Sequence, residues 1–371
     1  MQTFLRAILV FLIAFSSWVI YTSYKQNQQL AQFSDDYIWQ LNTSIKDATR
    51  NFLLPAKNIA KLGASFYQQE LISLDKPETL SSFVQPFIDS YPQFNGYFVG
   101  SEQKEFWFWH NTYADDYDFR IQTINKQAFN TSPKQQLIEQ KNFLDENRQS
   151  LRKSTPTVAQ YDATSRLWYK GAKAIGTGFW SDVYSFNSDR NHIIPGITAS
   201  YPIYDDKHRL LGVWGVDIVL EELSNFLFDI GSSRATDLVI FNEQEKVIAY
   251  SGYKNLPLKA KLLTLTDLNK PELKAAQKSY KEHGFSEFYF SQNGHRYLAS
   301  YSSFLFGEEQ DWHLLLVVPQ SQLISEMTTD FELIALFALV TLVISLLRLT
   351  FLIKQPVTRL IDLLVSKSST R

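Results

Sequence analysis

The chain has 371 residues and a formal net charge of -2, so it is long enough for two domains and gives no sign of a nucleic-acid partner. It contains no Cys, which excludes disulfides, thiolate catalysis and Cys-ligated zinc. Aromatic residues make up 15% of the chain, a high share, and most of them are expected to pack in cores or on the surface.

Two apolar segments predict how the chain meets a membrane. Residues 1–6 precede an uncharged apolar run at 7–24, close to the ~20 residues that span a bilayer, and no cleavage site follows it. An uncleaved anchor is therefore favoured over a cleaved signal peptide. A second run at 333–353 is interrupted only by Arg348, which can snorkel to an interface. Basic residues dominate the tail at 354–371, which predicts two spans with both termini in the cytoplasm.

Residues 25–75 follow the first span and carry apolar side chains at steps of three and four residues. This spacing predicts a long helix that forms a stalk outside the membrane, with Pro55 as a kink or break. Because the helix is long and has an apolar stripe, we also expect the protein to form a homodimer through it.

Strand candidates dominate the region between the stalk and the second span. Pairs of strands around polar turns are predicted at 94–110, 197–220 and 238–252, and three more strands follow. A short helix and a turn separate the second pair from the third. The sequence therefore predicts an α+β fold of two modules, a membrane-distal one at 76–230 and a membrane-proximal one at 231–326.

Catalytic and metal-binding signatures are missing from the sequence. It has no motif of a serine hydrolase, a zinc protease, a nucleotide-binding loop or a dinucleotide-binding fold. No two of the six His residues fall four positions apart or have a single residue between them, so we predict no metal site. Because nothing marks a nucleophile or a cofactor either, we expect a protein that is not an enzyme.

One stretch, "YDATSRLWYKGA" at 161–172, gathers charged and aromatic side chains in a region expected to face water. Burial of a zwitterion requires a partner for each of its charges, because an unpaired buried charge is costly. Arg166 suits a carboxylate through two parallel hydrogen bonds, and it stands just before a predicted short helix. Asp217, alone in an apolar strand, suits an ammonium group. Phenol hydroxyls and an indole N–H can complete the set.

The same residues also have simpler interpretations. Asp217 can cap the helix that follows its strand, or face solvent at the strand end. Arg166 can pair with Asp162 on the surface. Composition and spacing alone therefore leave both a binding site and these structural roles open.

Three stretches carry a resemblance to a known family: "RLWYKGA", "ASYPIYDDKHRLLGVWGVDIVLEELSNFL" and "LVIFNEQEKVIAYS". The region from Lys25 to Leu323 resembles a double Cache ectodomain, the tandem PAS-like sensor of bacterial chemoreceptors, sensor kinases and diguanylate cyclases. It is most similar to the subset whose distal module binds amino acids, which is marked by an ordered set of Tyr, Arg, Trp-Tyr, Tyr and a strand Asp. This sequence has Tyr161, Arg166, Trp168, Tyr169, Tyr184 and Asp217 in that order.

The resemblance implies a division of labour among these residues. Arg166 and Trp168 would hold the carboxylate of an α-amino acid, Asp217 would hold its amino group, and the three tyrosines would complete the hydrogen bonds. Leu167 departs from the family, which often has Pro at this position, but no ligand group is lost with it. The proximal module has no equivalent set of residues and is expected to act as a relay or spacer.

The resemblance also implies a place in the cell, namely the bacterial inner membrane with the central region in the periplasm. The tail at 354–371 resembles the opening helix of a HAMP linker that is truncated, which implies a longer receptor or a separate cytoplasmic signalling partner. Two alternatives stay open. The same fold can bind an organic acid or an amine, or the chain can be a two-span scaffold that regulates polysaccharide chain length.

Overall fold

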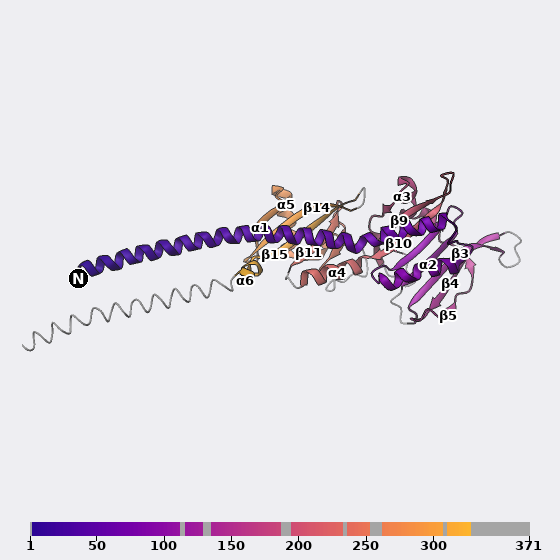
Figure 1. Cartoon of the computed structure of the whole chain (residues 1–371), viewed down its shortest axis with the longest axis horizontal. Coiled ribbons are helices and arrows are strands. Elements are labelled where there is room, and N and C mark those ends of the chain that lie inside the picture. Colours follow the sequence, from indigo (N-terminus) through magenta and orange to yellow (C-terminus); the bar gives the residue numbers. More distant parts are fainter. Residues whose placement is uncertain are drawn as a thin grey trace, which may run out of the picture. The chain divides into compact units, whose positions relative to one another are not determined.

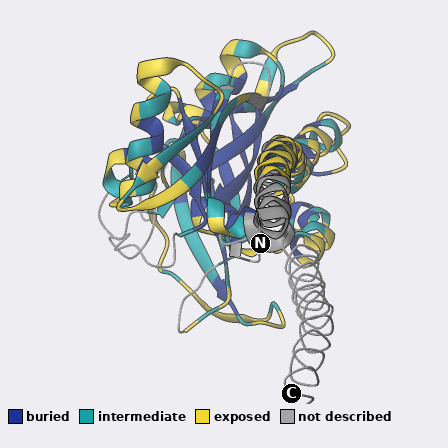
Figure 2. Ribbon diagram, turned by 90° about the vertical axis from the view of Figure 1, so that its left-hand side faces the viewer, coloured by how far each residue is buried: buried dark blue, intermediate teal, exposed yellow. Residues whose placement is uncertain are grey.

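The computed structural model describes residues 2–111, 116–128, 135–186, 194–232, 236–252, 262–306 and 310–327. The architecture is α+β, with antiparallel sheets and a long N-terminal helix, as predicted. Tyr37–Val318 form one compact unit, which contains residues of both sheets (Figure 1). Buried residues concentrate on the strands and on the inner sides of the helices (Figure 2).

The long helix α1 runs from Gln2 to Gln68. Pro55 lies inside this helix and does not end it, which excludes the break that was one of the expected alternatives. Proline removes one helical hydrogen bond, but Leu53, Ala56 and Ala60 beside it are completely buried. Burial of this apolar face stabilises the helix across the proline, because most helical stability in proteins comes from packing.

The sequence predicts membrane spans at residues 7–24 and 333–353. Within the part of the chain that the structure describes, no helix has a stretch that is both long enough and apolar enough to cross a bilayer. The segment at 333–353 and the linker-like tail at 354–371 lie outside the described residues.

The first sheet has ten strands in the order β5-β4-β3-β2-β1-β10-β9-β7, with β6 beside β4 and β8 beside β9. The strands predicted at 94–110 and 197–220 are confirmed as β1, β2, β9 and β10, whereas β3 to β8 were not predicted. The bounds are Gly96–Ser101 (β1), Phe106–Asn111 (β2), Phe119–Ala128 (β3), Gln135–Leu144 (β4), Ser150–Lys153 (β5), Thr157–Val158 (β6), Phe179–Trp180 (β7), Tyr184–Phe186 (β8), Ile194–Tyr204 (β9) and Leu210–Val219 (β10).

Helices cover both faces of this sheet. On one face, the Trp214 ring meets the Phe83 ring of α2 (Pro77–Ser90) edge-on at 5.3 Å and lies against Gly63 of α1. The other face is covered by the short helix η1 (Ala163–Ser165) and by α3 (Leu167–Ile175), which confirms the predicted short helix. Side chains alternate along each strand, so neighbouring residues of β2 and β10 contribute to opposite layers.

The second sheet has the strand order β12-β11-β15-β14-β13, and its strands confirm the predicted ones. Helix α4 joins it to the first sheet, α5 and η3 pack on one face, and α6 follows the last strand. The bounds are Leu220–Ser232 (α4), Asp237–Asn242 (β11), Val247–Tyr250 (β12), Leu265–Leu268 (η3), Pro271–His283 (α5), Glu287–Gln292 (β13), His295–Phe306 (β14), Gln310–Pro319 (β15) and Gln320–Met327 (α6).

Polar contacts join the two sheets. The Asp182 carboxylate, from the loop between β7 and β8, accepts hydrogen bonds from the Asn242 amide at 2.8 Å and from the Lys246 ammonium at 2.7 Å. Asn242 is the last residue of β11, and Lys246 directly precedes β12. Asp182 therefore links a loop of the first sheet to a turn of the second.

Candidate functional site

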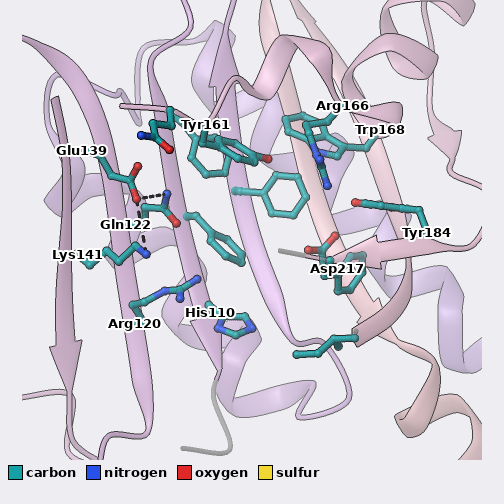
Figure 3. Close-up of a pocket in the computed structure, with 16 residues that line it drawn as sticks. His110, Arg120, Gln122, Glu139, Lys141, Tyr161, Arg166, Trp168, Tyr184 and Asp217 are labelled. Atoms are coloured by element: carbon teal, nitrogen blue, oxygen red, sulfur yellow. Dashed lines mark hydrogen bonds and ion pairs between the residues drawn. The ribbon is translucent and has the colours of Figure 1, made fainter. Parts of the chain in front are cut away.

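A cavity of about 350 Å³ lies on the face of the first sheet that η1 and α3 cover (Figure 3). Its floor is formed by residues of β1, β2, β3, β4 and β10, and its cover by residues 160–168 and by β8. A volume of this size suits a small molecule, since ligand pockets measure about 300–1,000 Å³.

The pairing of the strands places polar groups in one row across the floor. Asp217 of β10 pairs with Gly96 of β1, Gly96 pairs with His110 of β2, and His110 pairs with Arg120 of β3. Paired residues point to the same side of an antiparallel sheet. Gly96 adds no side chain to the row, and the Phe108 ring occupies the space above it, since a Cβ at Gly96 would lie 2.6 Å from that ring.

Arg166 lies directly before α3, with extended backbone angles (φ -80°, ψ 154°). Its guanidinium carbon lies 5.8 Å from the centre of the Tyr161 ring and 5.7 Å from the centre of the Tyr184 ring. Contacts of this kind hold a cation through the electron-rich face of the ring and leave its N–H donors available at the edge. All three residues line the cavity.

Trp168, in the first turn of α3, forms a wall of the cavity and is 1% exposed. Its ring centre lies 4.7 Å from that of Phe98 on β1. The close approach requires a glycine at position 100, because a Cβ there would lie 2.8 Å from the Ala163 Cβ and 3.3 Å from the Trp168 ring. The Ser200 hydroxyl donates to the Trp168 carbonyl at 3.0 Å, which fixes α3 on the sheet.

Asp217 lies near the C-terminal end of β10, on the floor of the cavity. The Thr198 hydroxyl is 2.5 Å from its carboxylate, and the Tyr184 hydroxyl is 2.7 Å from the Thr198 hydroxyl. A hydroxyl has one proton, so when Thr198 donates to an ionised Asp217 it accepts from Tyr184. These bonds orient the carboxylate and the phenol toward the same space.

Burial is the main influence on the pKa of the Asp217 carboxyl. It raises the pKa of this carboxyl to about 8, although the Thr198 hydrogen bond and the Arg166 charge act in the opposite direction. The empty cavity therefore holds a largely neutral acid at pH 7. A positively charged group beside Asp217 would favour the ionised form, so this position attracts a cation that is small enough to enter.

Tyr169 is the one predicted site residue that does not line the cavity. Its hydroxyl donates to the Glu102 carboxylate at 2.8 Å, and the Lys173 ammonium contacts the same carboxylate at 3.0 Å. Successive residues of an α-helix point about 100° apart, so Trp168 and Tyr169 face different directions. The structure brings the other five together: Tyr161, Arg166, Trp168, Tyr184 and Asp217.

A second group of polar residues lines the other end of the cavity, and the sequence analysis did not identify it. Gln122 of β3 donates to the Glu139 carboxylate of β4 at 3.0 Å, and the Lys141 ammonium lies 3.7 Å from the same carboxylate. Arg120 is 4% exposed, and its guanidinium carbon is 5.7 Å from the centre of the Phe108 ring. The lining also includes His110.

Alternation along β3 is the signal that could have identified part of this group. Arg120 and Gln122 stand two apart in "FRIQTI" (119–124), as one face of a strand requires, whereas "LIEQKN" (137–142) ends in four consecutive polar residues and shows no alternation. Among the described residues, no group of three or more His, Asp or Glu side chains is placed to hold a metal ion.

Comparison with known proteins gives one match to a family and several to solved structures. Residues 119–225 match the family described as methyl-accepting chemotaxis protein-like, first PDC sensor domain. The ligand-binding domain of the Pseudomonas aeruginosa PAO1 amino acid chemoreceptor PctB, in complex with L-Arg, is 14% identical, with a TM-score of 0.49 over 77% of this chain and 95% of that one. No curated protein matches the chain.

Two further structures are similar to this chain at the same level. The ligand-binding domain of the Pseudomonas fluorescens chemoreceptor CtaA, in complex with L-alanine, is 14% identical, with a TM-score of 0.49 over 78% of this chain and 98% of that one. The ligand-binding domain of Mlp24 with asparagine is 16% identical, with a TM-score of 0.47 over 81% of this chain and 97% of that one.

Proposed function

We propose that the protein is the sensor part of a bacterial signal-transduction receptor and binds an α-amino acid, a proposal supported by the match of residues 119–225 to the methyl-accepting chemotaxis protein-like first PDC sensor domain. The proposed site is the cavity on the first sheet. Arg166 binds the ligand carboxylate, Asp217 binds its ammonium group, and Tyr161, Trp168 and Tyr184 surround the backbone of the ligand.

The observation that carries this proposal is that a cation, Arg166, and a carboxyl group, Asp217, lie at the same side of one cavity. Arg166 stands at the cover and Asp217 at the floor, and both line the same space (Figure 3). A zwitterion satisfies both groups at once. An acid without an amine would form no ion pair with Asp217, which would stay largely protonated, and an amine without an acid would leave Arg166 without a carboxylate, so affinity is lower in either case.

The raised pKa of Asp217 supports the same assignment. When an ammonium group enters, the carboxyl loses its proton and forms an ion pair at a residue that is only 7% exposed, where charge pairs are stronger than at a surface. Tyr184 and Thr198 hold the ionised form through their chain of hydroxyls. Selectivity for the α-amino group thus rests on residues that only the folded sheet brings together.

The arrangement in the cell is part of this proposal. Residues 76–230 form the distal binding module on the stalk, and residues 231–326 form the proximal module. The spans at 7–24 and 333–353 anchor both in the inner membrane as a homodimer, with the tail at 354–371 leading to the signalling output. Ligand binding can shift the equilibrium between two states of the receptor only by as much as the ligand's affinities for the two states differ.

Calorimetric titration of the purified full-length chain tests the function. The ligands are the twenty amino acids, together with propionate and ethylamine, which are alanine without its amino group and without its carboxylate. Binding of some amino acids without the two fragments, and its loss in Arg166→Ala and Asp217→Asn, is the expected result. Arg296→Ala is the matched control, because Arg296 also lies over a tyrosine, 5.0 Å from the centre of the Tyr289 ring on the second sheet.

Binding of propionate alone would identify an organic-acid sensor, and binding of ethylamine alone an amine sensor; either result contradicts the amino-acid proposal. The absence of any heat with every amino acid at millimolar concentration would also contradict it. A folding check by circular dichroism on each variant separates a lost contact from a lost fold.

A further inference from the structure

One polar side chain on the floor of the cavity makes no hydrogen bond within the described part of the chain. His110 lies on β2 and lines the cavity; its Nδ1 is buried without a partner, and no described residue bonds its Nε2 either. Buried polar groups in proteins nearly always have a partner, because one without it loses the hydrogen bonds that it makes in water. A ligand in the cavity can supply that partner.

The strand register sets the distance between His110 and the ligand backbone. Asp217 pairs with Gly96, and Gly96 pairs with His110, so two strand steps of about 4.8 Å place the Cα atoms of Asp217 and His110 about 10 Å apart. Figure 3 shows both side chains in the same cavity. With the ligand ammonium at Asp217, a side chain of one or two methylene groups carries its terminal group toward the imidazole. A hydroxyl on the first side-chain carbon is too short for this span.

An aromatic surface connects the two polar groups. The Phe108 ring lies over Gly96, and its centre is 5.2 Å from that of the His110 ring. Phe98, which pairs with Phe108 on the neighbouring strand, lines the cavity as well. Methylene groups pack well on such ring faces, and these faces offer no strong partner to a polar group before it reaches His110.

The imidazole of His110 is neutral at pH 7, because burial and the charge of Arg120 lower its pKa to about 3. A neutral imidazole has one N–H donor and one acceptor nitrogen, and no described residue fixes which nitrogen carries the proton. His110 can therefore bond a carboxamide through the carbonyl oxygen or through the N–H group of that amide. It cannot form an ion pair.

Charged ligand side chains fit this position less well. The burial and the Arg120 charge that keep a proton off His110 also disfavour a ligand ammonium or guanidinium beside it. A ligand carboxylate would have to compete for Arg120 and Lys141, which already have partners in the protein; Lys141 lies 3.7 Å from the Glu139 carboxylate. A neutral carboxamide requires neither cation.

From this geometry we propose that His110 is a specificity-determining residue, which forms a hydrogen bond with a carboxamide at the end of the ligand side chain. The ligand is then asparagine or glutamine. The inference rests on the proposed function, because it requires the α-carboxylate and the α-ammonium to occupy Arg166 and Asp217. An apolar side chain would cover the imidazole and leave it without a partner, which reduces affinity.

Calorimetric titration of the full-length chain with matched ligands tests the ligand class. L-asparagine is compared with L-leucine, which has a similar shape, and L-glutamine with L-methionine, which has a similar length. L-aspartate and L-glutamate test the effect of charge, and L-serine tests the reach. We expect the better-bound amide to bind about tenfold more tightly than its apolar counterpart, and more tightly than its acid or serine, because only the amide gives the imidazole a neutral partner.

Two variants assign the preference to His110. His110→Phe keeps an aromatic ring against Phe108 but removes both nitrogens, so the amide-over-apolar ratio should fall to about one while affinity for the apolar ligand stays within about twofold. His110→Gln keeps a donor and an acceptor and should retain part of the ratio. His313→Phe is the matched control, because the Nδ1 of His313 is also buried without a partner and its ring packs at 5.4 Å on Phe241, but it lies on β15 and does not line the cavity.

A measurement on the wild-type protein keeps the test valid if His110→Phe does not fold. In protein labelled with ¹⁵N-histidine, the shifts of the ring nitrogens report which one carries the proton and whether it is hydrogen-bonded. The His110 imidazole is identified because it stays neutral down to about pH 3, and His313→Phe removes the other imidazole with a buried, unpartnered Nδ1 from the spectrum. The better-bound amide should move the His110 signal, and its apolar counterpart should move it less.

The outcomes distinguish this inference from the proposed function. If leucine or methionine binds as tightly as the amides, or an acid binds more tightly, the carboxamide class is wrong and the amino-acid function stands. If the amide preference persists in folded His110→Phe, or the His110 signal responds equally to amide and apolar ligands, the assignment to His110 is wrong. If no amino acid binds, the proposed function fails and this inference fails with it.

Discussion

The two sheets place a helix across one face, yet they fill the space beneath that helix differently. Under α5 and η3, the second sheet presents aliphatic and aromatic side chains that pack into a continuous core. On the side of the first sheet that α3 covers, Phe98 and Val213 also form a core with the helix, but Arg120, Gln122 and Asp217 line a cavity beside that core. Charged side chains that keep fixed hydrogen-bond partners cannot pack together to fill the space, as apolar side chains do. The comparison teaches that the side chains facing the helix, rather than the architecture, decide whether the layer binds a ligand.

The largest effect is expected in the packed layer. Leu315 on β15 is completely buried in the core under α5, so Leu315→Ala should lower the free energy of unfolding by about 2–5 kcal/mol. Chemical denaturation measures this cost, and calorimetric titration at 10 °C should show unchanged affinity for the preferred amino acid. A loss of affinity without unfolding would show that the second sheet shapes the cavity, and would break the comparison.

Protonation of Asp217 gives the next largest effect. Its pKa rises from the ordinary value of 3.8 to about 8 on folding, so the folded protein holds a proton that the unfolded chain releases above pH 4. The contribution of this residue therefore destabilises the empty protein as pH rises from about 4 to 8, by at most about 1.4 kcal/mol per unit. Asp217→Asn should remove that slope, measured as the difference in melting temperature between pH 5 and pH 7 relative to wild type.

An amino-acid ligand should change the same dependence of melting temperature on pH. Its ammonium group stabilises the ionised carboxylate, so saturating ligand should flatten the dependence of melting temperature on pH in the wild type but not in Asp217→Asn. An identical slope in both proteins without ligand would mean that Asp217 is ionised in the empty cavity.

The strands that could be predicted from the sequence are those with a continuous apolar run, such as "FWFW" in β2 and the run of β10 around Asp217. Strands β3 and β4 escaped prediction because Arg120, Gln122, Glu139 and Lys141 line the cavity at positions where apolar residues would otherwise mark a buried face. Strands are identified by apolar residues on their buried face, and in a strand that lines a binding cavity this face carries polar residues instead.

For the candidate site, the sequence indicated some of the residues but not how they are arranged in space. Arg166 and Asp217 were chosen for their chemistry, and the spacing between them in the chain says nothing about their distance in space. The register of β10, β1, β2 and β3 places Arg120 in the row of Asp217, and no local pattern contains that register. Tyr169 fits the sequence pattern as well as Trp168 does, but the helical turn directs it to Glu102.

The contact of Gly100 on β1 with Ala163 in η1 tests how tightly the cover of the cavity is held on the first sheet. A Cβ at this position would lie 2.8 Å from the Ala163 Cβ, so Gly100→Ala should push η1 and α3 away from β1 at a cost of about 1–3 kcal/mol. Ala163→Gly in the same chain should recover part of that stability, which a double-mutant cycle measures. Additive effects of the two substitutions would contradict this contact.

Tyrosine hydroxyls allow a finer test of the cavity boundary. Tyr169→Phe removes the bond to Glu102 and should lower stability by about 0.5–1.5 kcal/mol without changing affinity for the ligand. Tyr184→Phe removes the donor to Thr198 and should weaken binding severalfold at a similar cost in stability. Equal affinities in the two variants would show that the chain of hydroxyls does not serve the ligand.

The smallest effect belongs to the contact between the sheets. The side chains of Lys246 and Asp182 are 33% and 44% exposed, so the ion pair is partly screened by water, and Lys246→Met should lower stability by about 1 kcal/mol or less. Asp182 nevertheless lies two residues before Tyr184, whose hydroxyl reaches Asp217 through Thr198. If this loop transmits ligand binding to the second sheet, the ligand should change hydrogen exchange of the β11–β12 turn in the wild type and change it less in Lys246→Met. Equal exchange in both proteins would mean that the two sheets respond independently, and that the cavity of one has no effect on the packed layer of the other through this contact.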